Sequence, residues 1–411
     1  MSLGVYWDRD EVGRLERVDD RSREYFFSYS STPRLISLAL PISDEPFSPA
    51  QSRPFFEALL PEGTAREQIA SQLKIASSDS YGLLSEIGRD CAGALQILDA
   101  KRMSQTPAVR WLTEQELDAL IKDLPRHPLG MSRKGRLRLS LAGVQNKAVL
   151  VRSADGSFGE PLDGMPSTHI LKPEPSGEDY PGIATNEYFC MRLAESCGLA
   201  AAQVELIPVA DRPCLVVQRY DRDLDTSPPL RRHQEDLCQA LGLTPDFKYQ
   251  QEGWTQPSYA SLAGLLDEHS PSPGLDRLAA AQAAVFNFLV GNADAHAKNI
   301  SLMHSEEGVH LAPLYDVVST AAYPELERTL SLSIGDELDP DSITSVHFAD
   351  LAADFKLNEN SFVRVRRGLA ERVATRAQLL SDEARKQGWH HPCIDRIIET
   401  IAARSPRVAP A

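Results

Sequence analysis

One stretch decides the fold and the chemistry of this chain: Gly291-Asn-Ala-Asp294-Ala-His296-Ala-Lys298-Asn299-Ile300, followed by Leu314-Tyr315-Asp316. An aspartate, an asparagine five positions later and a second aspartate after a hairpin-sized gap are the acidic and metal-binding groups of a kinase-type phosphotransferase. In such sites one carboxylate orients the attacking hydroxyl, while an asparagine oxygen and another carboxylate bind Mg²⁺. The pattern therefore predicts phosphoryl transfer.

The surroundings of this stretch support that interpretation. Alone, Asp-x-x-x-x-Asn occurs often by chance, and the alternative is a solvated loop with ordinary Asx-turns. However, residues 278–290 predict a long apolar helix that stops at Gly291, and residues 300–304 and 309–312 predict two short strands around a polar turn. A buried helix, a polar loop and a hairpin that ends in Tyr315-Asp316 form the arrangement expected of a kinase C-lobe.

A kinase also needs a lysine for the phosphates, on a strand upstream of the C-lobe. Residues 168–172 form a short alternating run that ends in Lys172, just before Pro173. Residues 185–198 have helical spacing, with Thr185 or Asn186 as a possible cap, so Glu187 falls in the first turn. Glu187 is then placed either to pair with Lys172 or to favour the positive end of its helix.

Two apolar runs follow, at residues 204–209 and 214–220, separated by a turn-like segment. The second run ends in Gln218-Arg219-Tyr220-Asp221. In a kinase, the strand that leaves the N-lobe becomes the hinge whose backbone groups hydrogen-bond adenine. Gln218 to Tyr220 are the expected hinge.

Together these segments resemble the HipA family, the serine/threonine kinase toxins of type II toxin–antitoxin modules. The resemblance rests on seven ordered segments: Ser140-Leu-Ala-Gly-Val-Gln-Asn-Lys147, His169-Ile-Leu-Lys172, Asn186-Glu187, Gln218-Arg219-Tyr220-Asp221, Gln234-Glu235-Asp236-Leu-Cys-Gln239, Asn292-Ala-Asp294-Ala-His296-Ala-Lys298-Asn299 and Tyr315-Asp316. Residues 55–63 and 90–95 also resemble the small first subdomain of that family.

The resemblance implies a role for each matching position. Asp294 is the expected catalytic aspartate, Asn299 and Asp316 are the expected Mg²⁺ ligands, and Lys172 is expected to contact the ATP phosphates. Ser140 matches the serine on which the family autophosphorylates to inactivate itself. The remaining ATP-binding positions are the phosphate-covering loop of Ala142, Gly143, Val144, Gln145, Asn146 and Lys147, the hinge of Gln218, Arg219 and Tyr220, and the loop residues His296, Ala297 and Lys298.

The resemblance also implies a fold and partners. The fold class is α+β, a two-lobed protein-kinase-like fold with a mixed α/β N-lobe, an extra N-terminal subdomain and an all-helical C-lobe. The cofactors are ATP and Mg²⁺. The partner is a HipB-like DNA-binding antitoxin, through which the chain reaches DNA only indirectly, and the substrate is an aminoacyl-tRNA synthetase such as glutamyl-tRNA synthetase.

Several departures keep other functions open. The covering loop has one glycine, Gly143, so it matches neither Gly-x-Gly-x-x-Gly nor a Walker A sequence. The loop Asp294-x-His296-x-x-Asn299 is closer to that of phosphatidylinositol-type kinases, which leaves a small-molecule or lipid kinase as one alternative. A non-catalytic co-repressor module is the second.

Ser140 lies in a local basic cluster within an otherwise acidic chain. Arg133, Lys134, Arg136 and Arg138 precede it, and Lys147 follows. A phosphate on Ser140 could be captured by these side chains, which would draw the loop away from ATP. The same basic residues could instead attract the phosphates of ATP itself.

Composition agrees with a cytoplasmic enzyme of more than one lobe. The chain has 411 residues, a formal net charge of −15 and 42% hydrophobic residues. That charge argues against a broad nucleic-acid or anionic-membrane surface. No run approaches the ~18 apolar residues of a membrane span, and the N-terminus does not resemble a signal peptide. The six cysteines form no C-x-x-C pair and are expected to be reduced core residues.

The expected organisation has three parts. Residues 1–105 form the N-terminal subdomain, with short strands such as 35–40 and helices such as 64–73. Residues 106–225 form the kinase N-lobe with the covering loop and hinge. Residues 226–411 form the C-lobe with the catalytic and metal-binding loops, closed by helices near 346–356, 360–387 and 393–404.

Overall fold

A computed structural model of the chain describes residues 2–19, 22–100, 106–129, 146–175, 180–251, 253 and 256–408. The chain divides into two compact units, Met1–Pro173 with Ile207–Asp246, and Glu174–Leu206 with Phe247–Ala411. The expected three-part division stays a prediction, and its first boundary falls at residues 101–105, outside the described residues.

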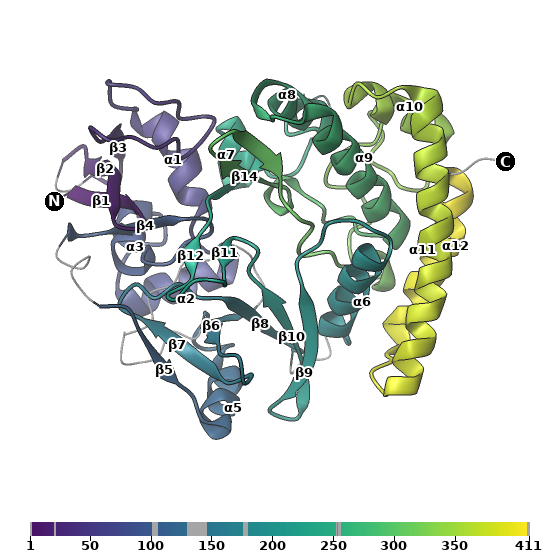
Figure 1. Cartoon of the computed structure of the whole chain (residues 1–411), viewed down its shortest axis with the longest axis horizontal. Helices are drawn as coiled ribbons and strands as arrows, with labels where there is room; N and C mark the ends of the chain where they lie inside the picture. Colours follow the sequence, from purple (N-terminus) through teal and green to yellow (C-terminus); the bar gives the residue numbers. More distant parts are fainter. Residues whose placement is uncertain are drawn as a thin grey trace. The chain divides into compact units, whose positions relative to one another are not determined.

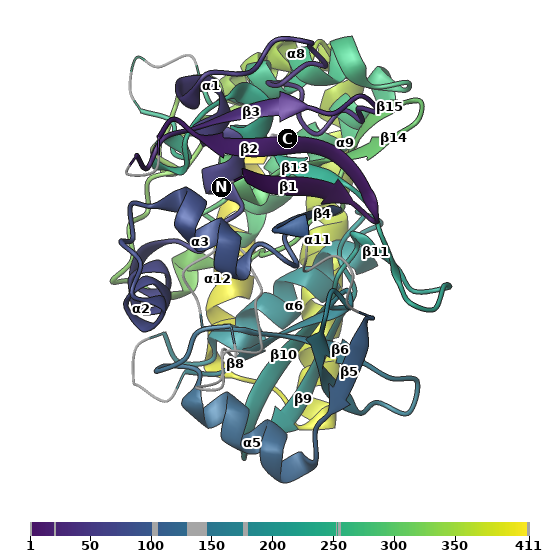
Figure 2. The same ribbon diagram turned by 90° about the vertical axis from the view of Figure 1, so that its left-hand side faces the viewer.

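The first unit begins with a four-stranded antiparallel sheet in the order β3-β2-β1-β4, seen side by side in Figure 2. Buried aromatic and aliphatic side chains such as Leu15, Phe27 and Phe56 form one core between this sheet and three helices. The bounds are β1 Ser2–Trp7, β2 Asp10–Arg17, β3 Tyr25–Tyr29, β4 Leu95–Leu98, α1 Pro49–Ala58, α2 Gly63–Leu73 and α3 Ser80–Ile87.

The first unit continues with a second sheet in the order β5-β7-β6-β8-β10-β9. Helix α5 (Glu114–Asp123) starts at a capping box formed by Thr113 and Glu116, and its Ile121 packs into the core of this sheet. The strands are β5 Ala108–Trp111, β6 Ala148–Arg152, β7 Phe158–Leu162, β8 His169–Pro173, β9 Val204–Val209 and β10 Arg212–Gln218. The short elements β11 Arg222–Asp223, β12 Leu230–Arg231, β13 Gln234–Asp236 and α7 Leu237–Leu241 complete the unit.

The second unit is helical apart from the hairpin that the sequence predicts. Its long helices α11 and α12 run side by side (Figure 1). The hairpin pairs β14 (Ser301–Ser305) with β15 (Gly308–Leu311). The helices are α6 Ile183–Ser196, α8 Tyr259–His269, α9 Pro273–Val290, α10 Ser345–Asp354, α11 Glu359–Gln387 and α12 Pro392–Val408, with short 3₁₀ turns at Pro245–Phe247, Ala297–Asn299 and Thr320–Ala322.

One expected element is wrong. Residues 35–40 do not form a strand; they contain only an isolated bridge between Ser37 and Leu40. The reason is tertiary, because the Ser37 hydroxyl and the Leu38 N–H both donate to the Glu235 carboxylate, at 2.6 and 3.0 Å. The Leu38 N–H, which a ladder could use, is thus directed to a side chain far along the chain.

All six cysteines are buried and none forms a disulfide, as expected. Within the described residues, none of the helices is both long enough and apolar enough to cross a bilayer.

Candidate active site

The catalytic loop, residues 291–299, begins where α9 ends. Gly291 caps the helix in the left-handed conformation, with φ +80°, which favours glycine. The Asn292 side chain then donates to Oδ1 of Asn287 in the last turns of the helix, at 2.9 Å. The loop therefore starts from a fixed helix end.

Asp294 is the exposed residue in a stretch whose other members, from Gly291 to Lys298, are buried. Its backbone N–H donates to Oδ1 of Asn292 at 3.0 Å. Its carbonyl accepts hydrogen bonds from the Asn299 side chain at 3.0 Å and from the His296 N–H at 2.8 Å. The backbone of Asp294 is held on both sides while its carboxylate faces outward, as a group that must meet a substrate would require.

The segment that carries Asp316 is bound to the catalytic loop just before this aspartate. The Tyr315 hydroxyl donates to the carbonyl of Lys298 at 2.6 Å, and it lies 2.7 Å from Oγ of Ser301. Tyr315 and Lys298 are the immediate neighbours of Asp316 and Asn299. The two expected metal ligands therefore follow residues that are directly hydrogen-bonded to each other.

The same segment is bound to the loop again after Asp316. The Thr320 hydroxyl accepts from the Ala293 N–H at 2.9 Å and donates to the Gly291 carbonyl at 3.0 Å. Between these attachments Asp316 has φ +56°, a conformation uncommon for residues other than glycine but tolerated by aspartate. Such unusual backbone concentrates at functional sites.

The oxygen donors of this unit are of the type that Mg²⁺ binds. No group of three or more histidine, cysteine, aspartate and glutamate side chains that could hold a metal occurs among the described residues. Mg²⁺ does not need one, because it is usually held by one or two carboxylates together with substrate phosphates and water. Asn299 and Asp316 fit that limited donor set.

The two lysines expected to bind phosphate belong to neighbouring strands of the first unit or lie just before them, Lys172 in β8 and Lys147 immediately before β6. Strands β6 and β8 pair Val149 with Ile170 and Ala148 with Leu171. Continuing this antiparallel register by one residue places Lys147 opposite Lys172. Both lysines are buried, with exposed fractions of 7% and 5%. Residues opposite each other in a ladder share a face of the sheet, so this register would direct both side chains to the same face.

Glu187 lies farther along α6 than expected. The helix starts at Ile183, so Glu187 is beyond the first turn, and neither Thr185 nor Asn186 is the cap. The carboxylate at the helix N-terminus belongs to Glu174, which accepts from the Ala184 N–H at 2.9 Å. Glu187 is therefore not the acid that favours the positive helix end, and its pairing with Lys172 stays a prediction.

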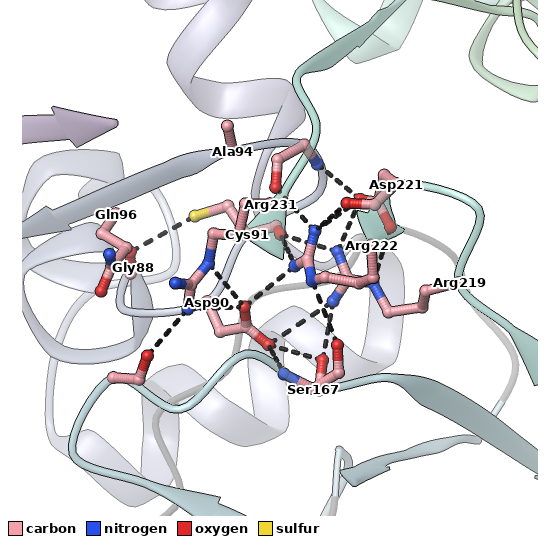
Figure 3. A network of polar contacts seen from close by, with 12 residues as sticks. Gly88, Asp90, Cys91, Ala94, Gln96, Ser167, Arg219, Asp221, Arg222 and Arg231 are labelled. Carbon is pink, nitrogen blue, oxygen red and sulfur yellow. Dashed lines mark hydrogen bonds and ion pairs between the residues drawn. The ribbon is translucent and has the colours of Figure 1, made fainter. Parts of the chain in front are cut away.

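The expected hinge begins at Gln218, the last residue of β10, and the side chains of Arg219 and Tyr220 are engaged inside the first unit. The Arg219 N–H donates to the Thr168 carbonyl at 2.9 Å, and its guanidinium binds Asp221 and Ser167, both at 2.8 Å. The Tyr220 hydroxyl donates to the Gln234 side chain. Figure 3 shows how Arg219 joins a buried network. A nucleotide contact by Arg219 would therefore have to use its carbonyl.

The remaining expected residues divide into two groups. His296, Ala297 and Lys298 are buried in the catalytic loop, where the His296 ring packs edge-on against Tyr249 at 5.2 Å. Of the expected phosphate-covering loop, Asn146 and Lys147 lie among the residues that the structure describes. Five positions lie outside the described residues: Ser140, Ala142, Gly143, Val144 and Gln145.

Three residues that hold the catalytic loop were not identified from the sequence: Tyr249, Asn292 and Thr320. The Tyr249 hydroxyl donates to Oδ1 of Asp294 at 3.0 Å. Asn292 lies inside the quoted motif, directly after the capping glycine of α9, so its position was a usable signal. Tyr249 and Thr320 are distant in sequence from Asp294, and no spacing rule connects them to it.

Comparison with known proteins identifies the family. The HipA N-terminal domain matches residues 3–98, and the HipA-like C-terminal domain matches residues 139–377. Y4mE of Sinorhizobium fredii, described as a candidate kinase, is 41% identical over 346 residues, 81% of this chain and 80% of its own length. The serine/threonine-protein kinase toxin HipA of Shewanella oneidensis is 31% identical over 353 residues, 80% of this chain and 79% of its own.

A solved structure agrees with these sequence matches. HipA in the complex of HipA, HipB and operator DNA from Shewanella oneidensis MR-1 superposes with a TM-score of 0.82 and 27% identity. The match covers 98% of this chain and 97% of that one. The fold and these relatives define an enzyme of the kinase class, with a two-lobed kinase-like fold. The chain belongs to the HipA family.

Proposed function

We propose that this chain is an ATP- and Mg²⁺-dependent serine/threonine kinase that acts as the toxin of a toxin–antitoxin module and phosphorylates a host protein to arrest growth. The observation that supports this most directly is Asp294, whose carboxylate is exposed on a loop held by hydrogen bonds at both of its backbone groups. A catalytic group held by its surroundings needs little reorganisation during the reaction.

In this proposal Asp294 orients the acceptor hydroxyl and takes its proton. Asn299 and Asp316 would hold Mg²⁺. Mg-ATP, when bound, would supply the phosphoryl group, and the metal ion would offset the negative charge of the phosphate oxygens. The hydrogen bonds from Tyr315 and Thr320 to the catalytic loop keep the segments that carry Asp316 and Asn299 in register.

Lys147 and Lys172 are proposed to bind the phosphates. Both lysines are buried in the first unit, Lys172 at the expected place in β8 and Lys147 just before β6, which supports this assignment. Glu187, buried in α6, is proposed as the carboxylate that orients Lys172, and Gln218 to Tyr220 as the hinge that contacts adenine through backbone groups.

Regulation and partners are proposed from the family. Ser140 is proposed as an inactivating autophosphorylation site within its basic sequence cluster. The Shewanella oneidensis HipA complex contains HipB and operator DNA, which supports a HipB-like antitoxin as partner and contact with DNA through that antitoxin. The proposed substrate is an aminoacyl-tRNA synthetase, glutamyl-tRNA synthetase being the first to test, and the proposed location is the cytoplasm.

The test compares wild type with Asp294→Asn, using Asp339→Asn as the matched control because Asp339 is an exposed aspartate outside the site. Expression should arrest growth for wild type and the control only. Phosphate transfer to protein should fall by roughly 100-fold or more in Asp294→Asn, the range of a lost general base.

Mass spectrometry of the cells that express each variant separates the protein-kinase, lipid-kinase and non-catalytic alternatives. New phosphopeptides on host proteins support a protein kinase. Phosphorylated small molecules or lipids without phosphopeptides would support the lipid-kinase alternative, and growth arrest by Asp294→Asn would support a non-catalytic module.

A further inference from the structure

Tyr249 approaches the proposed catalytic carboxylate directly. Its hydroxyl donates a hydrogen bond of 3.0 Å to Oδ1 of Asp294, 45 residues later in the chain. Tyr249 lies in an irregular segment of the second unit, between the 3₁₀ turn Pro245–Phe247 and α8. The residue as a whole is 43% exposed, so the hydroxyl is not placed there merely to bury an aromatic side chain.

The backbone on the N-terminal side of Tyr249 is attached to the catalytic loop. The carbonyl of Lys248 accepts a hydrogen bond of 3.0 Å from the N–H of Ala297, three residues after Asp294. The Lys248 ammonium also lies over the Tyr249 ring, 5.3 Å from its centre. These contacts fix where the tyrosine enters the site.

The backbone on the C-terminal side is attached as well, through one intermediate residue. The N–H of Gln250 donates to the Ser331 carbonyl at 2.9 Å. Ser331 donates in turn to the carbonyl of Ala293, the neighbour of Asp294, through its N–H at 2.9 Å and its hydroxyl at 2.6 Å. Tyr249 is thus held between two attachments that flank Asp294 in the loop.

The ring is oriented within this frame by His296. The two rings meet edge to face, with centres 5.2 Å apart and planes at 77°. Backbone attachments and ring packing together leave the hydroxyl little freedom. The carboxyl torsion of an aspartate is otherwise broad, so a fixed donor decides which oxygen faces which way.

We propose that Tyr249 is a positioning residue for phosphoryl transfer, which binds Oδ1 of Asp294 and thereby turns Oδ2 toward the acceptor hydroxyl. This inference rests on the proposed function of Asp294 as the catalytic base. As the new bond forms between the acceptor oxygen and the γ-phosphorus, the bond to the ADP oxygen breaks and the acceptor proton passes to Oδ2. Tyr249 keeps its own proton throughout.

The test variant is Tyr249→Phe, which removes the hydroxyl and keeps the ring. The matched control is Tyr188→Phe on α6, because Tyr188 is a partly exposed tyrosine of the same unit whose hydroxyl also makes a hydrogen bond, from Arg192 at 2.8 Å. The assay follows ³²P from [γ-³²P]ATP into the proteins of a heat-treated bacterial lysate, with ATP varied at constant lysate protein.

For Tyr249→Phe, kcat should fall by roughly 10- to 100-fold, the effect of losing one hydrogen bond to a charged group. The KM for ATP and the thermal unfolding midpoint should match those of Tyr188→Phe, because the hydroxyl acts on the acceptor and not on the nucleotide or the fold. A residue that only supported the structure would change the midpoint or the KM together with kcat.

Asp294→Asn, measured in parallel, separates failure of this inference from failure of the proposed function. Full activity in Asp294→Asn would overturn the proposed function itself. If Asp294→Asn is inactive while Tyr249→Phe equals Tyr188→Phe, only the role of Tyr249 is overturned. A higher kcat for Tyr249→Phe would also overturn the role of Tyr249, since the hydroxyl would then obstruct the acceptor. A lower thermal unfolding midpoint would show that the hydroxyl stabilises the fold instead.

Discussion

Oδ1 of Asp90 lies 3.0 Å from Nη2 of Arg222, and both side chains are almost completely buried. Oδ1 also accepts from Arg231 at 3.2 Å, and Oδ2 accepts from the Ser167 N–H at 3.1 Å (Figure 3). Burial raises the pKa of Asp90, but the arginines, Arg222 first, outweigh it and hold that pKa below its ordinary value. The network joins the segment matched by the N-terminal domain to the segment that contains the expected hinge.

Asp90→Asn should lower the free energy of unfolding by about 3 kcal/mol, because it leaves buried arginines with a neutral partner. Urea denaturation measures this change. Asp163→Asn is the control, since Asp163 also pairs with an arginine, Arg89, at 3.2 Å but is 45% exposed. The control should cost less than about 1 kcal/mol, as surface ion pairs do. Equal losses in both variants would contradict the importance of burial.

The shifted pKa of Asp354 should make the stability of the second unit depend on pH. It ends α10, and burial together with Asp336 and Asp350 raises its pKa to about 6. Because the folded-state pKa exceeds the unfolded one, this group favours folding fully below about pH 4 and loses that contribution as the pH rises through 6.

Asp354→Asn should therefore stabilise the protein at pH 7, by about 1 kcal/mol after allowing for solvent screening of a half-buried group. It should also flatten the stability profile between about pH 4 and pH 6 relative to wild type. Thermal unfolding across that range, with the exposed Asp382→Asn as control, provides the measurement. If Asp354→Asn were less stable than wild type at pH 7, the predicted direction of the stability change would be wrong.

Gly291 and Gly388 are the C-caps of α9 and α11 and have almost the same backbone conformation, with φ +80° and +81°. A Cβ at Gly291 would lie 2.6 Å from Cβ of Ala321, whereas nothing lies within 4 Å at Gly388. Gly388→Ala should cost about 1 kcal/mol from the left-handed conformation alone. Gly291→Ala should cost more and should also reduce phosphate transfer, since the catalytic loop starts there. Chemical denaturation measures the loss of stability in each variant, and the ³²P assay measures phosphate transfer. An equal loss of stability in Gly291→Ala and Gly388→Ala would argue against the steric explanation.

Asp316→Asn should raise the Mg²⁺ concentration needed for half-maximal phosphate transfer by roughly 10-fold or more, because a neutral oxygen replaces a charged metal ligand. Asp336→Asn is the control, as Asp336 is an exposed aspartate with a similar φ of +62°. Asparagine tolerates that backbone conformation at both positions. Mg²⁺ titrations that coincide for the two variants would remove Asp316 from the metal site.

The sequence by itself determined the α+β class, the kinase chemistry and the main helices and strands around the catalytic loop. The α+β class followed from the family resemblance, whereas the helices and strands could be predicted because apolar periodicity and the capping glycine Gly291 are local signals. The hairpin at β14 and β15 and the helix α9 follow from such signals. The spacing of Asp294, Asn299 and Asp316, from which phosphoryl transfer was predicted, is likewise a local pattern within a few dozen residues.

Only the tertiary structure decided which distant groups hold those residues in place. The side chain that binds the N-terminus of α6 is Glu174 and not Thr185 or Asn186. At residues 35–40 the Leu38 N–H donates to Glu235 instead of to a neighbouring strand. Tyr249 reaches Asp294 across 45 residues. Hydrogen bonds between remote segments depend on how the chain packs, and no local pattern encodes that packing.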